Sequence, residues 1–236
     1  MSLRRAFLQK LNNIIPLSSI ISEYKFNNNT LDTVGNNNGT SQGLTYVTGI
    51  VDEAADLSSG GATVPDSTDL RFTDGVSDLP FSISVMVYNN DINNAQNIVD
   101  KGIGSTNLAY QLRWRRGNAG FEFTLQTDVR SKRITIVYGA TPIVLGGQWY
   151  SLIVTYDGSQ LVSGMKMYID GLLVSPNQEV SSNPYTGMNG YTEPVSIGMS
   201  SSDVAVDCLR FWDAVLSSEQ AYEIATQELA GVDINP

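Results

Sequence analysis

One loop of the sequence has the ligands that a hard cation would use. Residues 27–40 (NNNTLDTVGNNNGT) are rich in asparagine and glycine and contain a single acid, Asp32. Carboxylate, side-chain amide and backbone carbonyl oxygens are the ligands that Ca²⁺ takes in proteins. The same composition also suits a loop that folds back on itself through Asx-turns. With one carboxylate among neutral oxygens, the composition favours the turn loop and keeps a calcium site as the alternative.

A second set of residues has the chemistry for binding a carbohydrate. Sugar rings stack on exposed aromatic faces, and Asn, Asp or Arg side chains hydrogen-bond their hydroxyl groups. Such residues occur in the long polar segment 175–194 and around a tryptophan earlier in the chain. The candidate glycan-binding residues are Tyr185, Tyr191, Asn183, Asn189, Trp114 and Arg113. The alternative for the two tyrosines is that they only anchor their loop.

Positive charge is concentrated in one short part of an acidic chain. The 236 residues carry a formal net charge of −10, which disfavours nucleic acid and anionic lipid as partners. Six of the 14 lysines and arginines nevertheless fall close together: Arg113, Arg115, Arg116, Arg130, Lys132 and Arg133. These cations are either the solvated side of neighbouring strands or a contact for an acidic partner. That partner would be a neighbouring subunit or an acidic glycan.

Composition excludes several kinds of enzyme chemistry. The chain has no histidine, which removes Ser-His-Asp triads, Cys-His catalysis and the usual zinc sites. The single cysteine, Cys208, cannot form an intrachain disulfide and is expected to be a small buried hydrophobe. No stretch approaches the roughly 20 apolar residues of a membrane-spanning helix. Arg4 and Arg5 precede an apolar stretch, but no small-residue cleavage site follows, so we expect this segment to be retained.

The elements that must position these residues are mostly short β-strands. In residues 147–171, apolar and polar residues alternate from Trp149 to Tyr156 and from Met165 to Ile169, and Asp-Gly pairs interrupt the alternation. This pattern predicts antiparallel strands joined by turns. Further strands are expected at 20–26, 44–51, 54–64, 81–87, 98–99, 110–114, 121–125, 134–138, 195–197 and 204–212. We therefore expect an all-β fold, a two-sheet antiparallel sandwich.

An amphipathic helix is predicted at the N-terminus. Its apolar residues recur at helical spacing, and Pro16 ends the pattern. A helix this short must pack on something, either on its own sandwich or on another subunit as an anchor. The residues expected to serve assembly are Leu3, Phe7, Leu11 and Ile14. We therefore assign residues 1–19 as a helical anchor segment and residues 20–236 as the sandwich domain.

A second short helix is predicted near the C-terminus, at residues 217–230. Ser217 and Gln220 fit a capping box, in which each residue satisfies the other's backbone N–H. The expected buried stripe is Ala221, Ile224, Ala225 and Leu229.

Several motifs occur in a characteristic order along the chain. They are YKF at 24–26, LDTVGNNNGT at 31–40, LPFSISV at 79–85, GQWYSLIVTYDG at 147–158, MYIDG at 167–171, VDCLRFW at 206–212 and LSSEQ at 216–220. In this order they resemble the laminin G-like and concanavalin A-like lectin/glucanase superfamily. The resemblance implies a two-sheet jelly roll. Its members include glycan-binding modules, adhesion domains, structural pieces of virions or cell surfaces and some glycosidases, so the fold does not decide the function.

The resemblance also implies where a metal or a catalytic pair would lie. In similar domains, the acid of the glycine-rich loop and an acid of the last long strand meet around Ca²⁺. The matching residues are Asp32, Asn38, Thr40 and Asp207. The alternative is that Asp32 caps its own turn and Asp207 pairs with a cation. Related glycosidases carry Glu-x-Asp-x-x-Glu on one strand; this spacing is absent, and Glu122 is isolated among apolar residues.

These patterns together predict a non-enzymatic structural or decoration protein of a virion, such as a phage, or of a cell surface. Charged residues make up only 16% of the chain, so Asn, Ser, Thr and Gly must form much of the surface, as in many extracellular and virion β proteins. The expected partners are other structural subunits, in a homo- or hetero-oligomer, and the jelly roll could also adhere to surface glycans. The alternatives are a calcium-dependent lectin and, third, a glycoside hydrolase.

Overall fold

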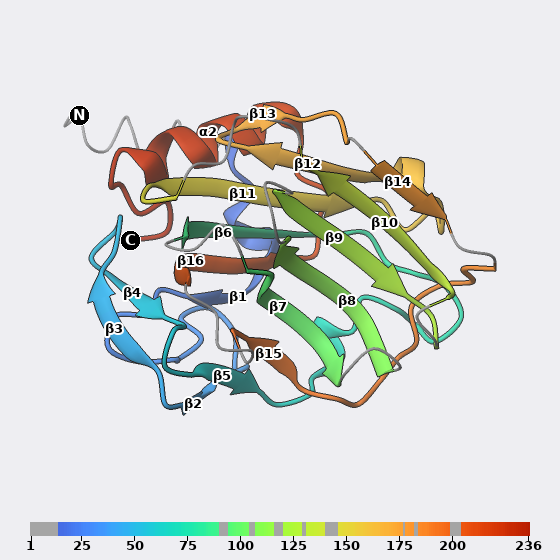
Figure 1. Ribbon diagram of the computed structural model, residues 1–236, viewed down its shortest axis with the longest axis horizontal. Coiled ribbons are helices and arrows are strands. Elements are labelled where there is room, and N and C mark those ends of the chain that lie inside the picture. Colours follow the sequence, from blue (N-terminus) through green and yellow to red (C-terminus); the bar gives the residue numbers. More distant parts are fainter. Residues whose placement is uncertain are drawn as a thin grey trace.

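Two antiparallel sheets of eight strands each form the protein (Figure 1). The computed structural model describes residues 14–89, 94–103, 107–115, 120–128, 131–139, 146–176, 178–181, 184–198 and 204–236. The expected all-β sandwich is confirmed. Most of the predicted N-terminal helix lies outside the described residues, so that helix stays a prediction.

The first sheet is built around the hairpin region that the sequence singled out. Its strand order is β13-β12-β11-β6-β16-β4-β3, and β1 also pairs with β16. The strands are β1 (Ile20–Tyr24), β3 (Thr45–Thr48), β4 (Glu53–Asp56), β6 (Phe81–Asn89), β11 (Trp149–Tyr156), β12 (Met165–Ile169), β13 (Leu172–Leu173) and β16 (Val204–Trp212). Between β12 and β13, Asp170 and Gly171 both have positive φ, as a tight primed turn requires.

The second sheet has the order β14-β10-β9-β8-β7-β15-β5-β2. Its strands are β2 (Thr40–Gln42), β5 (Gly61–Val64), β7 (Gln96–Ile103), β8 (Asn107–Trp114), β9 (Phe121–Gln126), β10 (Arg133–Tyr138), β14 (Gln178–Ser181) and β15 (Val195–Ile197). Four consecutive strands, β7 to β10, pair in sequence order and form its central part. They contain the segment in which the arginines are concentrated.

Helical structure is sparse in the described residues. Three 3₁₀-helices connect strands: η1 (Leu17–Ser19), η2 (Thr68–Leu70) and η3 (Val162–Gly164). The α-helix α2 (Ser218–Leu229) begins at the predicted capping box, with Ser217 and Gln220 each accepting from the other's backbone N–H. Among the described residues, no helix is both long and apolar enough to cross a lipid bilayer.

The main core lies between the two sheets, and the period of two determines which side chains enter it. On β8, Tyr110, Leu112 and Trp114 face the core, whereas Gln111 and Arg113 face away from it. Stacked rings of Phe72 and Phe81, 4.1 Å between centroids, mark the centre of the core. The inward faces of both sheets are therefore apolar.

The outward faces of the two sheets differ. A second apolar cluster, which includes Ile153, Tyr168 and Trp212, lies on the outward face of the first sheet and packs against Ala221 and Ile224 of α2. In Figure 1, α2 runs along the β11–β13 side of the molecule and not over β7–β10. The helix α2 therefore does not cover the outward face of β7–β10.

Some predicted strand limits were wrong. Residues 54–64, expected as one strand, form β4 and β5, and the turn between them carries the chain from one sheet to the other. Residues 98–99 are the middle of the longer β7, and β14 lies inside the predicted loop 175–194.

One position in α2 was also predicted wrongly. Leu229, expected to be buried, is 38% exposed, and Glu228 is buried in its place. Burying a carboxylate requires a charged partner. Arg210 is that partner.

Candidate functional site

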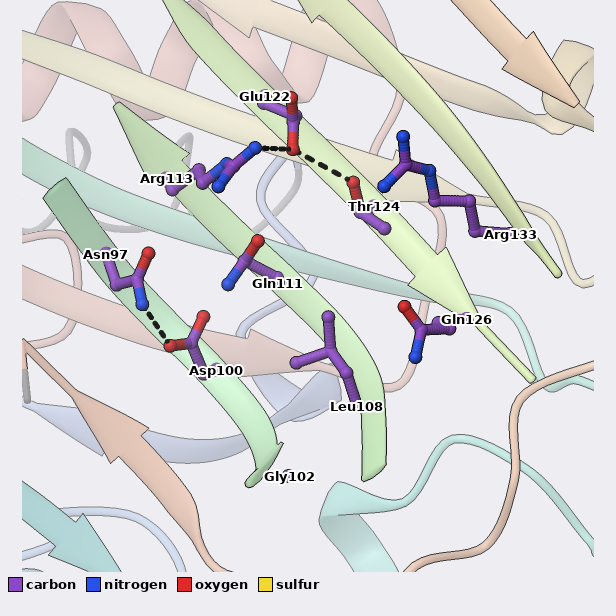
Figure 2. A pocket seen from close by; sticks show the side chains of 10 residues that line it. All are labelled: Asn97, Asp100, Gly102, Leu108, Gln111, Arg113, Glu122, Thr124, Gln126 and Arg133. Carbon is purple, nitrogen blue, oxygen red and sulfur yellow. Dashed lines mark hydrogen bonds and ion pairs between the residues drawn. The ribbon is translucent and has the colours of Figure 1, made fainter. Parts of the chain in front are cut away.

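A polar groove crosses the outward face of β7–β10 (Figure 2). Each strand contributes side chains to its lining: Asn97 and Asp100 from β7, Gln111 and Arg113 from β8, Glu122, Thr124 and Gln126 from β9, and Arg133 from β10. The hollow has a volume of about 180 Å³. Its floor therefore consists largely of amide, hydroxyl, carboxylate and guanidinium groups, which all hydrogen-bond.

Strand register brings these side chains into rows across the sheet. Asp100 pairs with Gln111, and Gln111 pairs with Thr124. In the next row, Arg113 pairs with Glu122. Directly opposite side chains on neighbouring strands lie within reach of each other, so the rows form a continuous polar surface.

A bulge in β7 places two groove residues on the same face. The pairing of β7 with β8 shifts between Asn97 and Val99, and Ile98 and Val99 are both buried in the core. Without the bulge, residues three apart in a strand would point to opposite faces. With it, the Asn97 side-chain amide donates to Asp100 Oδ2 at 2.8 Å.

Glu122 is held by two arginines. Its carboxylate accepts from Arg113 Nη2 at 2.7 Å and lies 3.4 Å from Arg115 Nε. The Thr124 hydroxyl donates to the same carboxylate at 3.3 Å. Arg113 Nε, by contrast, is buried and has no hydrogen-bond partner in the described part of the chain.

Asp100 is the carboxylate at the other side of the groove. Burial raises the pKa of Asp100 to about 6, and Gln111, Arg113 and Asn97 nearby offset part of that rise. Its Oδ1 is buried without a hydrogen-bond partner among the described residues. A buried polar atom without a partner costs about 1–3 kcal/mol, so a ligand that supplied a donor here would recover part of that cost.

The two carboxylates of the groove come from different strands. Asp100 and Glu122 lie on strands separated by β8 and in different rows, which puts their backbones roughly 12 Å apart at standard strand spacing. Glycosidases that retain configuration hold their two carboxyl groups about 5 Å apart, and those that invert it hold them about 6.5–9.5 Å apart. The expectation that the protein is not an enzyme stays a prediction.

Of the four residues of the calcium hypothesis, Asp32 and Asn38 are bonded to each other in one loop, and Asp207 is bonded elsewhere. Asp32 Oδ1 accepts from the backbone N–H groups of three residues, and Oδ2 accepts from a fourth, at 2.9–3.1 Å. Asn38 Oδ1 accepts from Asp32 N, and Thr40 is exposed at the start of β2. Asp207 Oδ2 accepts from Val51 N at 2.9 Å. Among the described residues, no three acidic, cysteine or histidine side chains cluster for a metal, and the calcium hypothesis stays a prediction.

The two loop tyrosines are attached to the sandwich through their hydroxyl groups. Tyr185 and the core residue Tyr156 both donate to Asp78 Oδ2 at 2.7 Å. Tyr191 donates to the carbonyl oxygen of Asp128 at 3.4 Å. Asn189 is exposed in the same loop, and Asn183 lies outside the described residues. These contacts are those of the loop-anchoring alternative.

The expectation that Trp114 stacks on a sugar was wrong. Trp114 is 1% exposed and packs edge-to-face against Phe121 inside the sandwich. Its neighbour Arg113 lines the groove, as a glycan-binding residue would. Alternation gives the reason, because adjacent residues of a strand point to opposite faces and only one of the two can face the ligand.

Sequence reasoning missed most of the groove. Asp100, Gln111, Thr124 and Gln126 were not singled out, and Arg133 was noted only as part of the basic segment. The available signal was the polar half of the alternation on β8 and β9. Because polar outward positions are common on any exposed sheet, that signal did not distinguish a groove from an ordinary solvated face.

The predicted assembly residues are only partly described. Leu3, Phe7 and Leu11 lie outside the described residues, and Ile14 is half-buried. The next residue, Ile15, packs in the apolar cluster with Ile20 and Trp212. The role of this segment in assembly stays a prediction.

Comparison with known proteins identifies the family. Residues 56–221 match a family model of the concanavalin A-like lectin/glucanases superfamily, so the chain belongs to this superfamily. No curated protein sequence gives a significant match.

Solved structures share the fold at low sequence identity. Domain 4 of AbnA, an extracellular arabinanase from Geobacillus stearothermophilus solved with arabinotriose, is 20% identical with a TM-score of 0.66, and the match covers 88% of this chain and 98% of that one. The binding domain of Paraclostridial mosquitocidal protein 1 is 15% identical with a TM-score of 0.67, covering 87% of this chain and 51% of that one. The botulinum neurotoxin serotype D ligand-binding domain, solved with N-acetylneuraminic acid, is 18% identical with a TM-score of 0.66, covering 92% and 52%. This chain thus spans about half the length of the two toxin chains.

Proposed function

We propose that this protein is a non-catalytic carbohydrate-binding module that holds a glycan in the groove on β7–β10. The observation that carries the proposal is a polar hollow built from four adjacent strands, in which Asp100 Oδ1 and Arg113 Nε are buried without hydrogen-bond partners among the residues that the structure describes. Sugars present closely spaced hydroxyl groups, and a floor of mixed donors and acceptors matches them. Two of the structurally similar domains were solved with sugars, which supports the proposal at the level of the fold.

Glycan binding by groove variants tests this proposal. Binding to a glycan array, followed by titration calorimetry on the strongest hit, should weaken about tenfold in Gln111→Ala and in Asn97→Ala, because each loses hydrogen bonds to the sugar. The matched control is Gln42→Ala on β2, at the far end of the same sheet and exposed. Unchanged affinity in both groove variants would show that the groove is not the sugar site.

Absence of hydrolysis is part of the proposal. Asp100 and Glu122 lie on strands separated by β8 and in different rows, and Glu122 is paired with two arginines, which does not suit a general acid or a nucleophile. A bound glycan should therefore be recovered uncut after long incubation, as judged by mass spectrometry. Cleavage by the wild type that disappears in Glu122→Gln would establish a glycoside hydrolase instead.

A location on the surface of a particle or cell completes the proposal. The N-terminal segment would attach the sandwich to other structural subunits, and the open face of β7–β10 would point outward. Because Ile15 is buried in the apolar cluster, a clean test deletes only residues 2–13. The truncated protein should fold and bind glycan but fail to join its assembly, and normal incorporation would refute the anchor.

A further inference from the structure

The side of α2 that faces away from the first sheet carries an exposed stripe. Tyr222, Thr226 and Leu229 are four and three residues apart, a spacing that places side chains along one face of a helix. Tyr222 is 54% exposed and Leu229 is 38% exposed. The Thr226 hydroxyl donates to the carbonyl oxygen of Tyr222 at 2.7 Å, so its hydrogen bond is made within the helix. We call these three residues the outer stripe.

Strand β13 adds apolar surface beside the outer stripe. In Figure 1, α2 and β13 lie side by side at one edge of the molecule. The turn before β13 packs closely on the helix, because a Cβ on Gly171 would lie 2.7 Å from the Cα atom of Tyr222. Leu172 and Leu173 follow this turn and are 64% and 56% exposed. Large apolar side chains thus gather at one exposed place, which is typical of a surface that another segment covers.

The N-terminal segment fits the outer stripe in length and in pattern. The residues on its predicted apolar face are four, four and three apart, as the residues of the outer stripe are four and three apart. A helix over residues 3–14 would be about 18 Å long, the length of the 12-residue α2. Ile14, the first described residue, is α-helical, and Ile15 belongs to the apolar cluster that includes Ile224 of α2. The segment therefore joins the sandwich at α2.

The charges of the two elements are complementary. The N-terminal segment carries three cations and no acid, whereas α2 carries three glutamates and no cation. Arg4 and Lys10 are each three residues from Phe7, so both border the predicted apolar face. On α2, Glu219 is exposed and Glu223 is half-buried. Two helices packed along these faces would place opposite charges beside the apolar contact.

We propose that residues 2–13 pack as a helix on the outer stripe of α2 in the same chain. This inference goes beyond the glycan-binding proposal and does not depend on it. A segment linked to its site has a high effective concentration there, which favours this docking over the same contact with a second copy. A structural subunit that took up the segment would compete with α2 for its apolar face.

Tryptic cleavage of the segment tests the inference. Arg4, Arg5 and Lys10 are the cleavage sites, and a helix that is packed on the protein must open before a protease can cut it. Mass spectrometry of the intact protein should show cleavage at these sites at least about tenfold slower than in a synthetic peptide of residues 1–15. Tyr222→Ser combined with Leu229→Ser should bring the rate to within about threefold of the peptide.

Val76→Ser is the matched control. Val76 is also an exposed apolar residue, but it lies in the turn before β6 and not on α2. Its substitution should leave the cleavage rate at the wild-type value. Thermal melting of each variant shows whether the sandwich is intact, and substitutions at exposed positions are expected to leave it so.

A variant of the charges tests the second part of the fit. Glu219→Gln combined with Glu223→Gln should speed cleavage by about twofold, because exposed ion pairs contribute little. The effect should be smaller at high salt, which screens the charges in the wild type as well.

The other outcomes would overturn the inference. Cleavage of the wild type as fast as that of the peptide would show that the segment is not docked. Protection that the double substitution of Tyr222 and Leu229 leaves unchanged would show that the segment packs elsewhere. Protection that is lost on dilution of the protein would show that the segment docks on a second copy, since a contact within one chain does not depend on concentration.

Discussion

Asp100 is a carboxyl group that folding places in an unfavourable environment. It lies in the groove, one of its oxygens is buried without a partner in the described part of the chain, and burial raises its pKa from 3.8 to about 6. A carboxyl group whose pKa is higher in the folded state than in the unfolded state makes the fold less stable as the pH rises. Below the unfolded pKa the group is protonated in both states and has no such cost. The cost develops as the pH rises from about 4 to about 6. At neutral pH, Asp100 therefore costs stability, as ligand-binding groups often do.

Asp100→Asn should make the protein more stable at neutral pH. The expected gain in the free energy of unfolding at pH 7.5 is roughly 1–3 kcal/mol, because the neutral amide avoids the cost of burying charge. The gain should shrink toward zero near pH 4, where Asp100 is itself protonated. Urea unfolding at the two pH values measures both.

The exposed Asp52→Asn is the control for that experiment, since it changes the same chemical group without burial. It should shift stability by less than about 0.5 kcal/mol at either pH. An equal effect of the two substitutions would mean that Asp100 is not destabilising in the folded state.

Asp78 fixes the polar loop to the core. Its carboxylate accepts from Tyr156, from Tyr185 and from the backbone N–H of Met188, the last at 2.6 Å. Burial and the adjacent Asp78 charge raise the pKa of the Tyr185 hydroxyl well above its usual value, so it stays a donor at any ordinary pH. Tyr185 is thus oriented by the protein and not by a ligand.

Tyr185→Phe should therefore reduce stability without changing glycan affinity. Loss of one hydrogen bond to a charged acceptor predicts a cost of about 1–3 kcal/mol, read from urea unfolding. Affinity for the best array glycan should stay within about twofold of the wild type, since the hydroxyl is already used. A large loss of affinity at unchanged stability would return this tyrosine to the list of sugar contacts.

At the scale of elements, a buried ion cluster holds α2 and the C-terminal residues to β1 and β16. Arg210 on β16 is fully buried and bonds Glu23 of β1 at 2.5 Å, Glu228 of α2, and Asp233 beyond the helix at 3.2 Å. Lys25 extends the cluster by bonding Asp233 at 2.6 Å. The cluster therefore joins the first strand of the chain to three segments near its C-terminus.

Arg210→Met should destabilise the fold strongly. The substitution keeps the side chain's approximate volume but leaves Glu23 and Glu228 buried without their cation, which predicts a cost of about 3–5 kcal/mol. The cost should be smaller at pH 5, where the uncompensated carboxyls can take up protons. Chemical unfolding at the two pH values checks both expectations.

Two further variants serve as a control and as a milder substitution of Arg210. Lys132→Met removes a partly exposed surface ion pair and should cost at most about 1 kcal/mol. Arg210→Lys keeps the positive charge but loses the several donors of the guanidinium group. Its cost in stability should lie between those of Arg210→Met and Lys132→Met, and the protein should fold even if Arg210→Met does not. Similar costs for Arg210→Met and Lys132→Met would show that the cluster contributes little.

At the scale of the whole molecule, the two outward faces differ in chemistry. The outward face of the first sheet carries an apolar cluster and a buried ion cluster that pack against α2, whereas β7–β10 present polar and charged groups and a groove. The first sheet therefore anchors the C-terminal helix, and the second carries the groove. In the glycine-rich loop, the Asp32 carboxylate accepts from four backbone N–H groups.

Metal removal should leave the thermal stability unchanged. Asp32 accepts four backbone N–H groups, three of them on one oxygen, so its carboxylate has little capacity left for a cation. Melting temperatures in excess EDTA and in excess Ca²⁺ should agree within about 1 °C, because a ligand raises stability only by binding the folded state. A rise with Ca²⁺ together with calcium-dependent sugar capture would establish the calcium-dependent lectin.

The sequence by itself determined the fold class, the family and much of the strand layout. Period-two alternation is a local pattern that is visible in the sequence of a single strand. The order of the motifs, such as MYIDG at its primed turn, indicated the family. The capping box of α2 was equally readable, because both partners lie within one turn.

Only the tertiary structure decided where the groove lies. Alternation puts Arg113 and Trp114 on opposite faces of the strand, but it does not say which face packs against the other sheet. In the folded protein, Trp114 faces the core. The bulge in β7 brought Asn97 and Asp100 to one face against the simple period. The groove joins side chains from four strands, so it depends on register between segments distant in sequence, which a linear pattern does not contain.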